Sequence, residues 1–333
     1  MKVESIAQLT ALLKRGDRRA LAQCITLLES AKPSDIPKKA ELLNACSTSI
    51  TSSVRIAITG SPGVGKSSLI ELMGMNLISS GHKVAVLAID PSSTKTGGSI
   101  LGDKTRMTRL SKNPQAFIRP SPTSGLLGGV TATTRETIMI CEAAGYDRIL
   151  IETVGVGQSE TAAANLADFV LFVTMAGSGD GLQGIKRGIL ESIDIVAVNK
   201  ADGPNKAASS TFARELESAL HLLHGNGTAP IVFLTSAEDN IGIEEVVAHV
   251  EAAAERRKGS SDWESKRNQQ WLDWFDEAIS MAILKRVAHS EDLTALKAEL
   301  RTEIGQHKRH PFEAAQTFAD SLFGGQRPGP QST

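Results

Sequence analysis

A run of eight residues has the composition and spacing of a phosphate-binding loop. It reads Gly60-Ser61-Pro62-Gly63-Val64-Gly65-Lys66-Ser67 and fits the pattern G-x-x-x-x-G-K-[ST] at every position. Glycines let backbone N–H groups turn toward phosphate oxygens, and the positive end of the helix dipole, around Ser68, adds to this attraction. In such loops the lysine reaches the β- and γ-phosphates and the serine hydroxyl ligates Mg²⁺. The run predicts a nucleoside triphosphate site.

Two alternative roles for these glycines are weaker. One is a plain strand-to-helix turn with a chance lysine, but residues 54–59 read as a buried strand and an amphipathic helix follows the loop. The second is a dinucleotide fingerprint, which needs a third glycine where this chain has Lys66, Ser67 and Ser68. Because strand, loop and helix agree, the phosphate loop is favoured.

Acidic residues near strand ends are the candidate partners of Mg²⁺. Asp90 and Glu152 end predicted strands, and Asp103 lies in a glycine-rich loop between them. A carboxylate at a strand end beside the phosphate loop is where such enzymes hold the metal. Glu152 stands where many GTP-binding proteins have the Asp of Asp-x-x-Gly, so the amide of Gly155 becomes a candidate donor to the γ-phosphate.

Three glycine-rich segments are candidates for loops that change with the γ-phosphate, namely 97–107, 123–130 and 177–187. The first contains Asp103, the second precedes a predicted helix at 131–145, and the third follows a predicted strand. A surface loop with solvated acids stays open for the first segment, and a passive connection for the third.

A second motif predicts the base. Asn199-Lys200-Ala201-Asp202 follows an apolar strand and has the form Asn-Lys-x-Asp, which selects guanine in GTP-binding proteins. The Asp carboxylate accepts hydrogen bonds from guanine N1–H and the exocyclic amine. A base without those donors would leave the carboxylate unpaired, at a cost of about 1–3 kcal/mol. After the last predicted strand, Ser236 and Ala237 form a turn of the kind whose main-chain amide backs the base. ATP is the minority alternative.

Composition and charge narrow the class of protein. The 333 residues have a formal net charge of −1, with 41% hydrophobic and 22% charged residues, as in an ordinary globular protein. The near-neutral charge argues against nucleic-acid and anionic-membrane partners. No apolar run reaches the ~18 residues that span a bilayer. Three widely spaced cysteines give no metal-binding pair and fit a reducing compartment, so we expect a cytoplasmic protein.

The chain alternates strand and helix over residues 51–258, which predicts an α/β P-loop NTPase with a mostly parallel, doubly wound sheet. The six expected strands are 54–59, 83–90, 148–152, 168–175, 193–199 and 230–235. Ligands in such sheets bind beyond the carboxyl ends of the strands, where the motifs above lie.

Helical segments flank this domain. Residues 1–50 read as an N-terminal helical extension, packed on the nucleotide domain or serving as a partner-binding arm. Residues 259–323 read as a C-terminal helical arm that carries all three tryptophans, and such aromatics suit a core or an interface between copies. We expect a disordered tail at 324–333, which is rich in Gly, Pro and Gln.

These motifs and long surrounding blocks give the chain a resemblance to one family over nearly its whole length. It resembles the G-protein chaperones of adenosylcobalamin-dependent acyl-CoA mutases, some of which carry the label arginine/ornithine transport ATPase or kinase. The shared blocks begin at residues 16–21 and include 97–107, 152–160, 182–186 and the C-terminal helices.

The resemblance implies a slow GTPase that binds GTP/GDP and Mg²⁺ and is stimulated by its partner. It implies a homodimer joined by the C-terminal helices, which gates cofactor loading and ejects inactive cofactor. The partner would be a mutase of the methylmalonyl-CoA, isobutyryl-CoA or 2-hydroxyisobutyryl-CoA type. The residues that match the family's phosphate and Mg²⁺ positions are Lys66, Ser67, Asp90, Asp103 and Glu152, and those that match its base site are Asn199, Lys200 and Asp202.

One position departs from the family, and further function classes stay open. Gly181 stands where the family usually has a second acid after Asp180, in a loop thought to relay nucleotide state. A metallochaperone for a nickel enzyme would need a Cys/His cluster, which the sequence does not suggest. A small-molecule or protein kinase would need a base for its acceptor. A non-hydrolysing scaffold is disfavoured by the intact Lys66, Ser67 and Glu152.

Overall fold

The computed structural model describes residues 5–30, 32–47, 53–89, 107–121, 127–153, 159–177, 192–225 and 229–322. The chain divides into two compact units, residues 1–270 and 271–333. In the described part of the chain, no helix is long and apolar enough to cross a membrane.

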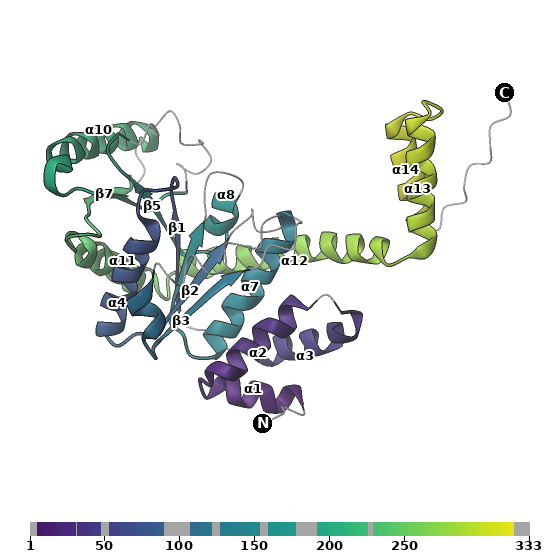
Figure 1. The fold of residues 1–333 in the computed structure, drawn as a ribbon, viewed down its shortest axis with the longest axis horizontal. Coiled ribbons are helices and arrows are strands. Elements are labelled where there is room, and N and C mark those ends of the chain that lie inside the picture. The colour runs from purple at the N-terminus through teal and green to yellow at the C-terminus, as the bar shows by residue number, and fades with distance from the viewer. Residues whose placement is uncertain are drawn as a thin grey trace. The chain divides into compact units, whose positions relative to one another are not determined.

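A seven-stranded parallel sheet forms the centre of the first unit (Figure 1). Its strands, in spatial order, are β3 (Ala116–Ser121), β2 (Val84–Ile89), β4 (Arg148–Thr153), β1 (Val54–Thr59), β5 (Phe169–Thr174), β6 (Ile195–Val198) and β7 (Ile231–Leu234). Every neighbouring pair is parallel. Strands β2, β4 and β5 are buried along their whole length, as expected when helices cover both faces. The predicted α/β P-loop architecture is confirmed.

Strand β3 was not among the six expected strands. It pairs only with β2 and so lies at one edge of the sheet. Its sequence contains Arg119 and Pro120, and proline inside a strand is tolerated at an edge because no ladder hydrogen bond is lost there. The same residues weaken the apolar pattern that marks a central strand, so the prediction of six strands was one short.

Helices cover both faces of the sheet (Figure 1). Alternate strand residues enter two hydrophobic clusters: Ala57, Leu87 and Ile151 enter the first, and Ile56, Val86 and Leu150 enter the second. The helical elements of the first unit are α1 (Ile6–Lys14), α2 (Arg18–Glu29), η1 (Pro33–Asp35), α3 (Ile36–Ser47), α4 (Lys66–Ser79), α6 (Thr108–Lys112), α7 (Leu127–Ala143), α8 (Ser159–Ala164), η2 (Gly203–Asn205), α10 (Lys206–His224), α11 (Ile243–Arg257) and the start of α12 (Ser261–Ala288).

The N-terminal helices α1 to α3 pack on the sheet domain. Gly16, with φ of 78°, ends the first helix, and the Asp17 carboxylate caps the second by accepting from the amides of Arg19 and Ala20 at 2.8 Å. Leu21 and Leu42 are fully buried in the same cluster as helix α7. In the structure, residues of these helices thus share a core with the sheet domain, while the N-terminal extension over residues 1–50 stays a prediction as a domain.

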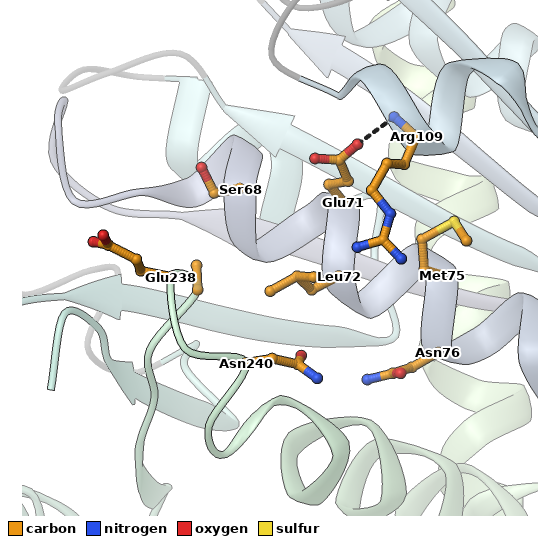
Figure 2. A pocket seen from close by; sticks show the side chains of 9 residues that line it. Ser68, Glu71, Leu72, Met75, Asn76, Arg109, Glu238 and Asn240 are labelled. Carbon is orange, nitrogen blue, oxygen red and sulfur yellow. Dashed lines mark hydrogen bonds between the residues drawn. The ribbon is translucent and has the colours of Figure 1, made fainter. Parts of the chain in front are cut away.

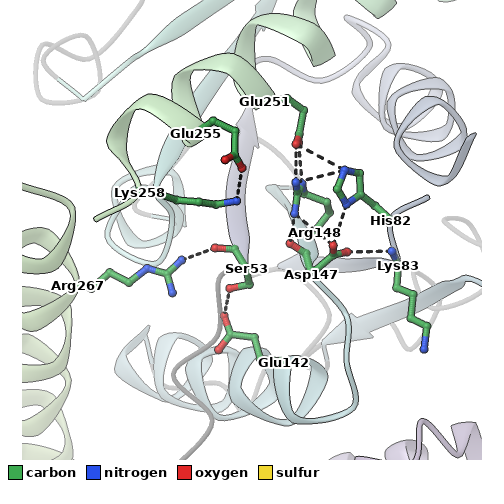
Figure 3. A network of polar contacts seen from close by, with 10 residues as sticks. All are labelled: Ser53, His82, Lys83, Glu142, Asp147, Arg148, Glu251, Glu255, Lys258 and Arg267. Carbon is green, nitrogen blue, oxygen red and sulfur yellow. Dashed lines mark hydrogen bonds and ion pairs between the residues drawn. The ribbon is translucent and has the colours of Figure 1, made fainter. Parts of the chain in front are cut away.

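A polar network fixes helices to the sheet away from the phosphate loop (Figure 3). Arg148 of β4 is bound through its Nε to Glu251 of α11 at 2.6 Å. Ser53, just before β1, donates to Glu142 of α7, and its carbonyl accepts from Arg267 of α12 at 2.7 Å. These contacts join α7, α11 and α12 to β4 and to the residue before β1.

Asp168, which precedes β5, anchors the start of α12. Its carboxylate is 1% exposed and accepts from the Arg55 amide at 2.8 Å and from Arg267 Nε and Nη2 at 3.0 and 2.7 Å. Its carbonyl accepts from Lys266 at 2.8 Å. Arg55 is bound in turn to Glu142, so the buried charges on β1, α7 and α12 form one paired set.

The second unit contains the rest of α12, α13 (Glu291–Gly305) and α14 (Pro311–Leu322). Leu296, Leu300 and Ala314 form its small buried cluster. Among the described residues of this unit, seven large apolar side chains are exposed: Trp271, Leu272, Phe275, Ile279, Ile283, Leu284 and Phe312. The predicted arm at 259–323 stays a prediction, and the tail at 324–333 lies outside the described residues.

Candidate nucleotide-binding site

The phosphate loop follows β1, near the middle of the sheet, and two of its glycines are required by close contacts. Gly60 has φ of 140°, and a Cβ there would lie 2.0 Å from the Val173 carbonyl oxygen of β5. Gly65 has φ of 95°, and a Cβ there would lie 2.5 Å from Asn199 Nδ2. Because no side chain fits either position, the loop passes tightly between β5 and the base motif.

Lys66 opens helix α4 and turns its ammonium group back across the loop. The Nζ atom donates to the carbonyl oxygens of Gly60 at 2.6 Å and Ser61 at 2.9 Å, and the residue is 7% exposed. A buried positive charge inside a glycine-rich turn at a helix start is complementary to phosphate.

Ser67 and Glu152 are adjacent although 85 residues separate them. The Ser67 hydroxyl donates to Glu152 Oε1 at 2.8 Å, and Glu152 is 3% exposed. The contact forms because β4 pairs with β1, in a register that sets Glu152 opposite Ile58. Hydroxyl and carboxylate oxygens are the donors that Mg²⁺ prefers, so the donor set fits this ion.

Three further predicted site residues, Asp90, Asp103 and Gly155, lie outside the described residues. The same holds for residues 97–106, 123–126 and 178–187 of the three expected nucleotide-responsive segments, including Gly181. Their assigned roles stay predictions.

Asn199 connects the phosphate loop to the base motif. Its side-chain Nδ2 donates to the Val64 carbonyl oxygen at 2.8 Å, and its Oδ1 accepts from the Ala237 amide at 3.2 Å and from Thr235 Oγ1 at 3.3 Å. The residue is 1% exposed. The sequence motif assigned Asn199 to base recognition. In the structure its side chain also links the phosphate loop, through Val64, to the turn after β7, through Ala237.

Asp202 is oriented by the turn that follows β7. Ser236 Oγ donates to Asp202 Oδ2 and accepts from the Asp239 amide at 3.0 Å. Ser236 and Ile241 exchange both backbone hydrogen bonds, which closes the turn, and Lys200 adopts φ of 58°. The structure thus brings together the Asn199–Asp202 motif and the Ser236–Ala237 turn.

A cavity of about 380 Å³ opens between α4 and this turn (Figure 2). Its lining residues are Ser68, Glu71, Leu72, Met75, Asn76, Arg109, Ala237, Glu238 and Asn240. In Figure 2 the Arg109 side chain extends along α4, and the amides of Asn76 and Asn240 face each other. Glu71 and Arg109 belong to no sequence motif; the only signal was that Glu71 lies one helical turn after Ser67.

Metal-binding clusters of another kind are absent from the part of the chain that the structure describes. Within it, no group of three or more His, Cys, Asp or Glu side chains is arranged to hold a metal ion. The three cysteines are buried, and burial raises the pKa of the Cys24 thiol to about 12. Such a thiol is a poor metal ligand at neutral pH.

One protein family matches most of the chain. A sequence model of the family described as methylmalonyl Co-A mutase-associated GTPase MeaB matches residues 21–292.

Relatives and a solved structure agree with this match. A probable GTPase of Mycobacterium tuberculosis is 46% identical over 319 residues, which are 95% of each chain. The Escherichia coli GTPase ArgK is 42% identical over 290 residues, covering 86% of this chain and 88% of its own. A mouse protein named methylmalonic aciduria type A homolog, mitochondrial, is 43% identical over 82% of this chain and 69% of its own. The crystal structure of a LAO/AO transport system kinase superposes with a TM-score of 0.72 at 30% identity, covering 97% of this chain and 99% of that one.

Proposed function

The chain belongs to the methylmalonyl-CoA mutase-associated GTPase family, and on that premise we propose that it is a GTPase chaperone of an adenosylcobalamin-dependent acyl-CoA mutase. Hydrolysis of GTP to GDP and phosphate is the activity of this family. We assign to this chain the gating of cofactor loading and the removal of inactive cofactor. The observation that carries the GTP-specific part is the link through Asn199 between the phosphate loop and the turn that holds Asp202.

The roles of the site residues follow from their match to the sequence motifs and, for Lys66, Ser67 and Glu152, are supported by their contacts. Lys66 and the backbone N–H groups of residues 60–68 bind the β- and γ-phosphates, and the Gly155 amide donates to the γ-phosphate. Ser67 and Glu152 hold Mg²⁺ together with Asp90 and Asp103. The ion supplies charge neutralisation on the phosphoryl oxygens.

The base site selects guanine through the hydrogen bonds that it makes with the base. Asp202 accepts from guanine N1–H and the exocyclic amine, with Ser236 fixing the carboxylate. Lys200 and the Ala237 amide complete the site around the base. Because that amide donates to Asn199 Oδ1, guanine binding would share or replace this bond.

Two observations support the proposed partners. The names of the family and of a relative point to a mutase, and the exposed apolar side chains of the second unit point to a second copy of the chain. The family is described by its association with methylmalonyl-CoA mutase, and the mouse relative carries the name of methylmalonic aciduria type A. Mutases that act on methylmalonyl-CoA, isobutyryl-CoA or 2-hydroxyisobutyryl-CoA are the candidates.

The exposed apolar side chains of the second unit suit contact with a second copy, and we propose a homodimer through them.

Phosphate release measured with and without each candidate mutase tests the proposal. We expect slow turnover alone and at least ~10-fold faster turnover with the cognate mutase, because a partner can supply further groups to the transition state of phosphoryl transfer. A parallel pull-down with GDP and with a non-hydrolysable GTP analogue should show binding that depends on the nucleotide. Equal turnover and equal capture under all conditions would exclude the chaperone role. Transfer of radiolabelled phosphate to a protein or small-molecule acceptor would indicate a kinase instead.

A further inference from the structure

The side chain of Arg109 enters the cavity between α4 and the turn after β7. The residue belongs to α6 and lines the cavity together with residues of α4 and of the turn. Figure 2 shows its guanidinium directed along α4 toward Leu72. Within the described residues this guanidinium makes no hydrogen bond and no ion pair, and only the backbone amide of Arg109 is bound. Its N–H donors and its flat face are therefore available to a ligand.

The backbone of Arg109 is fixed against α4. Glu71 Oε1 accepts from the amides of Arg109 at 2.6 Å and Leu110 at 3.4 Å, two groups that a helix start leaves without intrahelical partners. Leu110 is fully buried and fills the space beside Gly74, where a Cβ would lie 2.7 Å from Leu110 Cδ2. The guanidinium thus extends into the cavity from a backbone that two contacts hold in place.

The cavity borders both parts of the candidate nucleotide site. Ser68 directly follows the phosphate loop, and Ala237 contributes the amide that backs the base in the proposed site, and both line the cavity. The motif Asn199–Asp202 does not line it. A guanine held by that motif and by the Ala237 amide would therefore turn toward the cavity a part of its surface that the motif does not cover.

The lining suits an uncharged ring better than a second anion. Two carboxylates, those of Glu71 and Glu238, accompany the single guanidinium of Arg109, so the charged lining residues have a formal net charge of −1. That surplus repels an anionic group, whereas the π face of an aromatic ring attracts a guanidinium. Further apolar and amide side chains complete the walls, namely Leu72, Met75, Ala237, Asn76 and Asn240.

We propose that Arg109 is a nucleotide-binding residue whose guanidinium stacks on the face of the guanine base that is turned toward the cavity. This inference rests on the proposed GTP site and adds to it a residue outside the sequence motifs. A guanidinium stacks on any flat ring, so Arg109 contributes affinity while Asp202 selects the base. GDP and GTP carry the same base, and the contribution is the same for both.

Calorimetric titration of the full-length protein with GDP and with a non-hydrolysable GTP analogue, both in Mg²⁺ buffer, measures this contribution. Arg109→Ala should weaken the binding of both nucleotides at least ~5-fold, the order expected for a guanidinium on an aromatic face. The ratio of the two affinities should stay within about 2-fold of the wild-type ratio, because the lost contact is to the base.

Two further variants separate the flat shape of the group from its charge. Arg109→Lys keeps the charge without the plane and should bind both nucleotides at least ~3-fold more weakly than the wild type. Arg109→Trp supplies another flat group that stacks on bases and should bind both within about 3-fold of the wild type. Lys112→Ala is the matched control, since Lys112 is an exposed cation of the same helix that does not line the cavity, and its removal should change neither affinity.

Unchanged affinities in Arg109→Ala would overturn the inference. A loss confined to the GTP analogue would also overturn it, as would full recovery by Arg109→Lys without recovery by Arg109→Trp, because Arg109 would then act on a phosphate through its charge. A wild-type protein that bound neither nucleotide would instead show that the proposed GTP site is wrong.

Discussion

The carboxylate of Asp202 combines two properties that a base-selecting group needs, a fixed orientation and no basic partner among the hydrogen bonds described for it. Ser236 Oγ donates to Oδ2, which leaves Oδ1 able to accept from a ligand. Asp202→Asn converts one acceptor into a donor. We expect GTP affinity to fall by roughly 10- to 100-fold, from the 1–3 kcal/mol cost of an unpaired buried group, and affinity for xanthosine triphosphate to rise.

Titration calorimetry with both nucleotides checks this change of specificity. Asp239→Asn is a matched control because it makes the same substitution in the adjacent turn at an exposed position. That variant should bind GTP as the wild type does. If Asp202→Asn kept the wild-type preference, the base-site assignment would have to be abandoned.

Two glycines of the phosphate loop differ in what surrounds them, which gives a second prediction. Gly60 has the Val173 carbonyl oxygen 2.0 Å from its missing Cβ, whereas nothing lies within 4 Å of the corresponding position at Gly63. Both have positive φ, so alanine strains both by about 1–3 kcal/mol. Gly60→Ala adds a backbone collision.

Urea unfolding should therefore show a larger loss of stability for Gly60→Ala than for Gly63→Ala, by at least ~2 kcal/mol. The predicted order reflects packing, since both substitutions are chemically identical. Equal losses would mean that the loop relaxes away from β5.

Much of the candidate site was predictable from the sequence because its motifs are local. Residues 60–67 and 199–202 are short patterns in which spacing alone defines the geometry. The cap from Glu71 to α6 was not predictable, since it joins residues 38 positions apart through a backbone amide. The bridging role of Asn199 depends likewise on a loop 135 residues away.

At the scale of elements, buried charge pairs hold the start of α12. Asp168 binds Arg267 through two hydrogen bonds. The Arg267 guanidinium lies over the Trp263 ring, with Cζ 5.1 Å from the ring centroid. Removing one partner from a buried pair leaves the other charge uncompensated, which costs about 3–5 kcal/mol. Asp168→Asn should lower the free energy of unfolding by that order and free the first turns of α12.

Urea unfolding and hydrogen exchange over residues 263–270 measure both effects. Asp276→Asn, the same substitution at an exposed position of α12, should change stability by less than ~0.5 kcal/mol. Retained protection of residues 263–270 in Asp168→Asn would show that apolar packing of Trp263 is sufficient to hold the helix.

The strands differed in how well the sequence marked them. The five that lie inside the sheet, among them β2 and β5, are mostly apolar and were found within two residues at each end. At the edges, β7 was found although Ile231 and Leu234 are exposed, but β3 was missed. The strand order could not be read from the sequence, because it depends on crossovers that local pattern does not encode.

At the scale of the whole molecule, the exposed apolar side chains of the second unit lead to a prediction about assembly. Trp271, Phe275, Ile279 and Ile283 follow one another at intervals of four residues and form a stripe on α12, each at least 42% exposed. A stripe of this size is stable in water when another surface covers it. Phe275→Glu should convert the proposed homodimer into a monomer, because a buried carboxylate is strongly disfavoured.

Light scattering after size-exclusion chromatography measures the molar mass of the protein in solution and so distinguishes a monomer from a dimer. Ser265→Glu is the control, since it adds the same charge at an exposed polar position of the same helix and should leave the mass unchanged. A wild-type protein that is already monomeric at micromolar concentration would contradict the homodimer.

The amide side chain of Asn199 has a thermodynamic consequence for ligand recognition. It is hydrogen-bonded at once to the loop for the polyphosphate and to the turn for the purine. A shift of one of these segments would act on the other through this single planar group. The two halves of a bound nucleotide would then reinforce each other's affinity by equal factors, as linkage requires. Guanosine and pyrophosphate would be recognised as a unit, and the whole ligand would bind more tightly than its separated pieces.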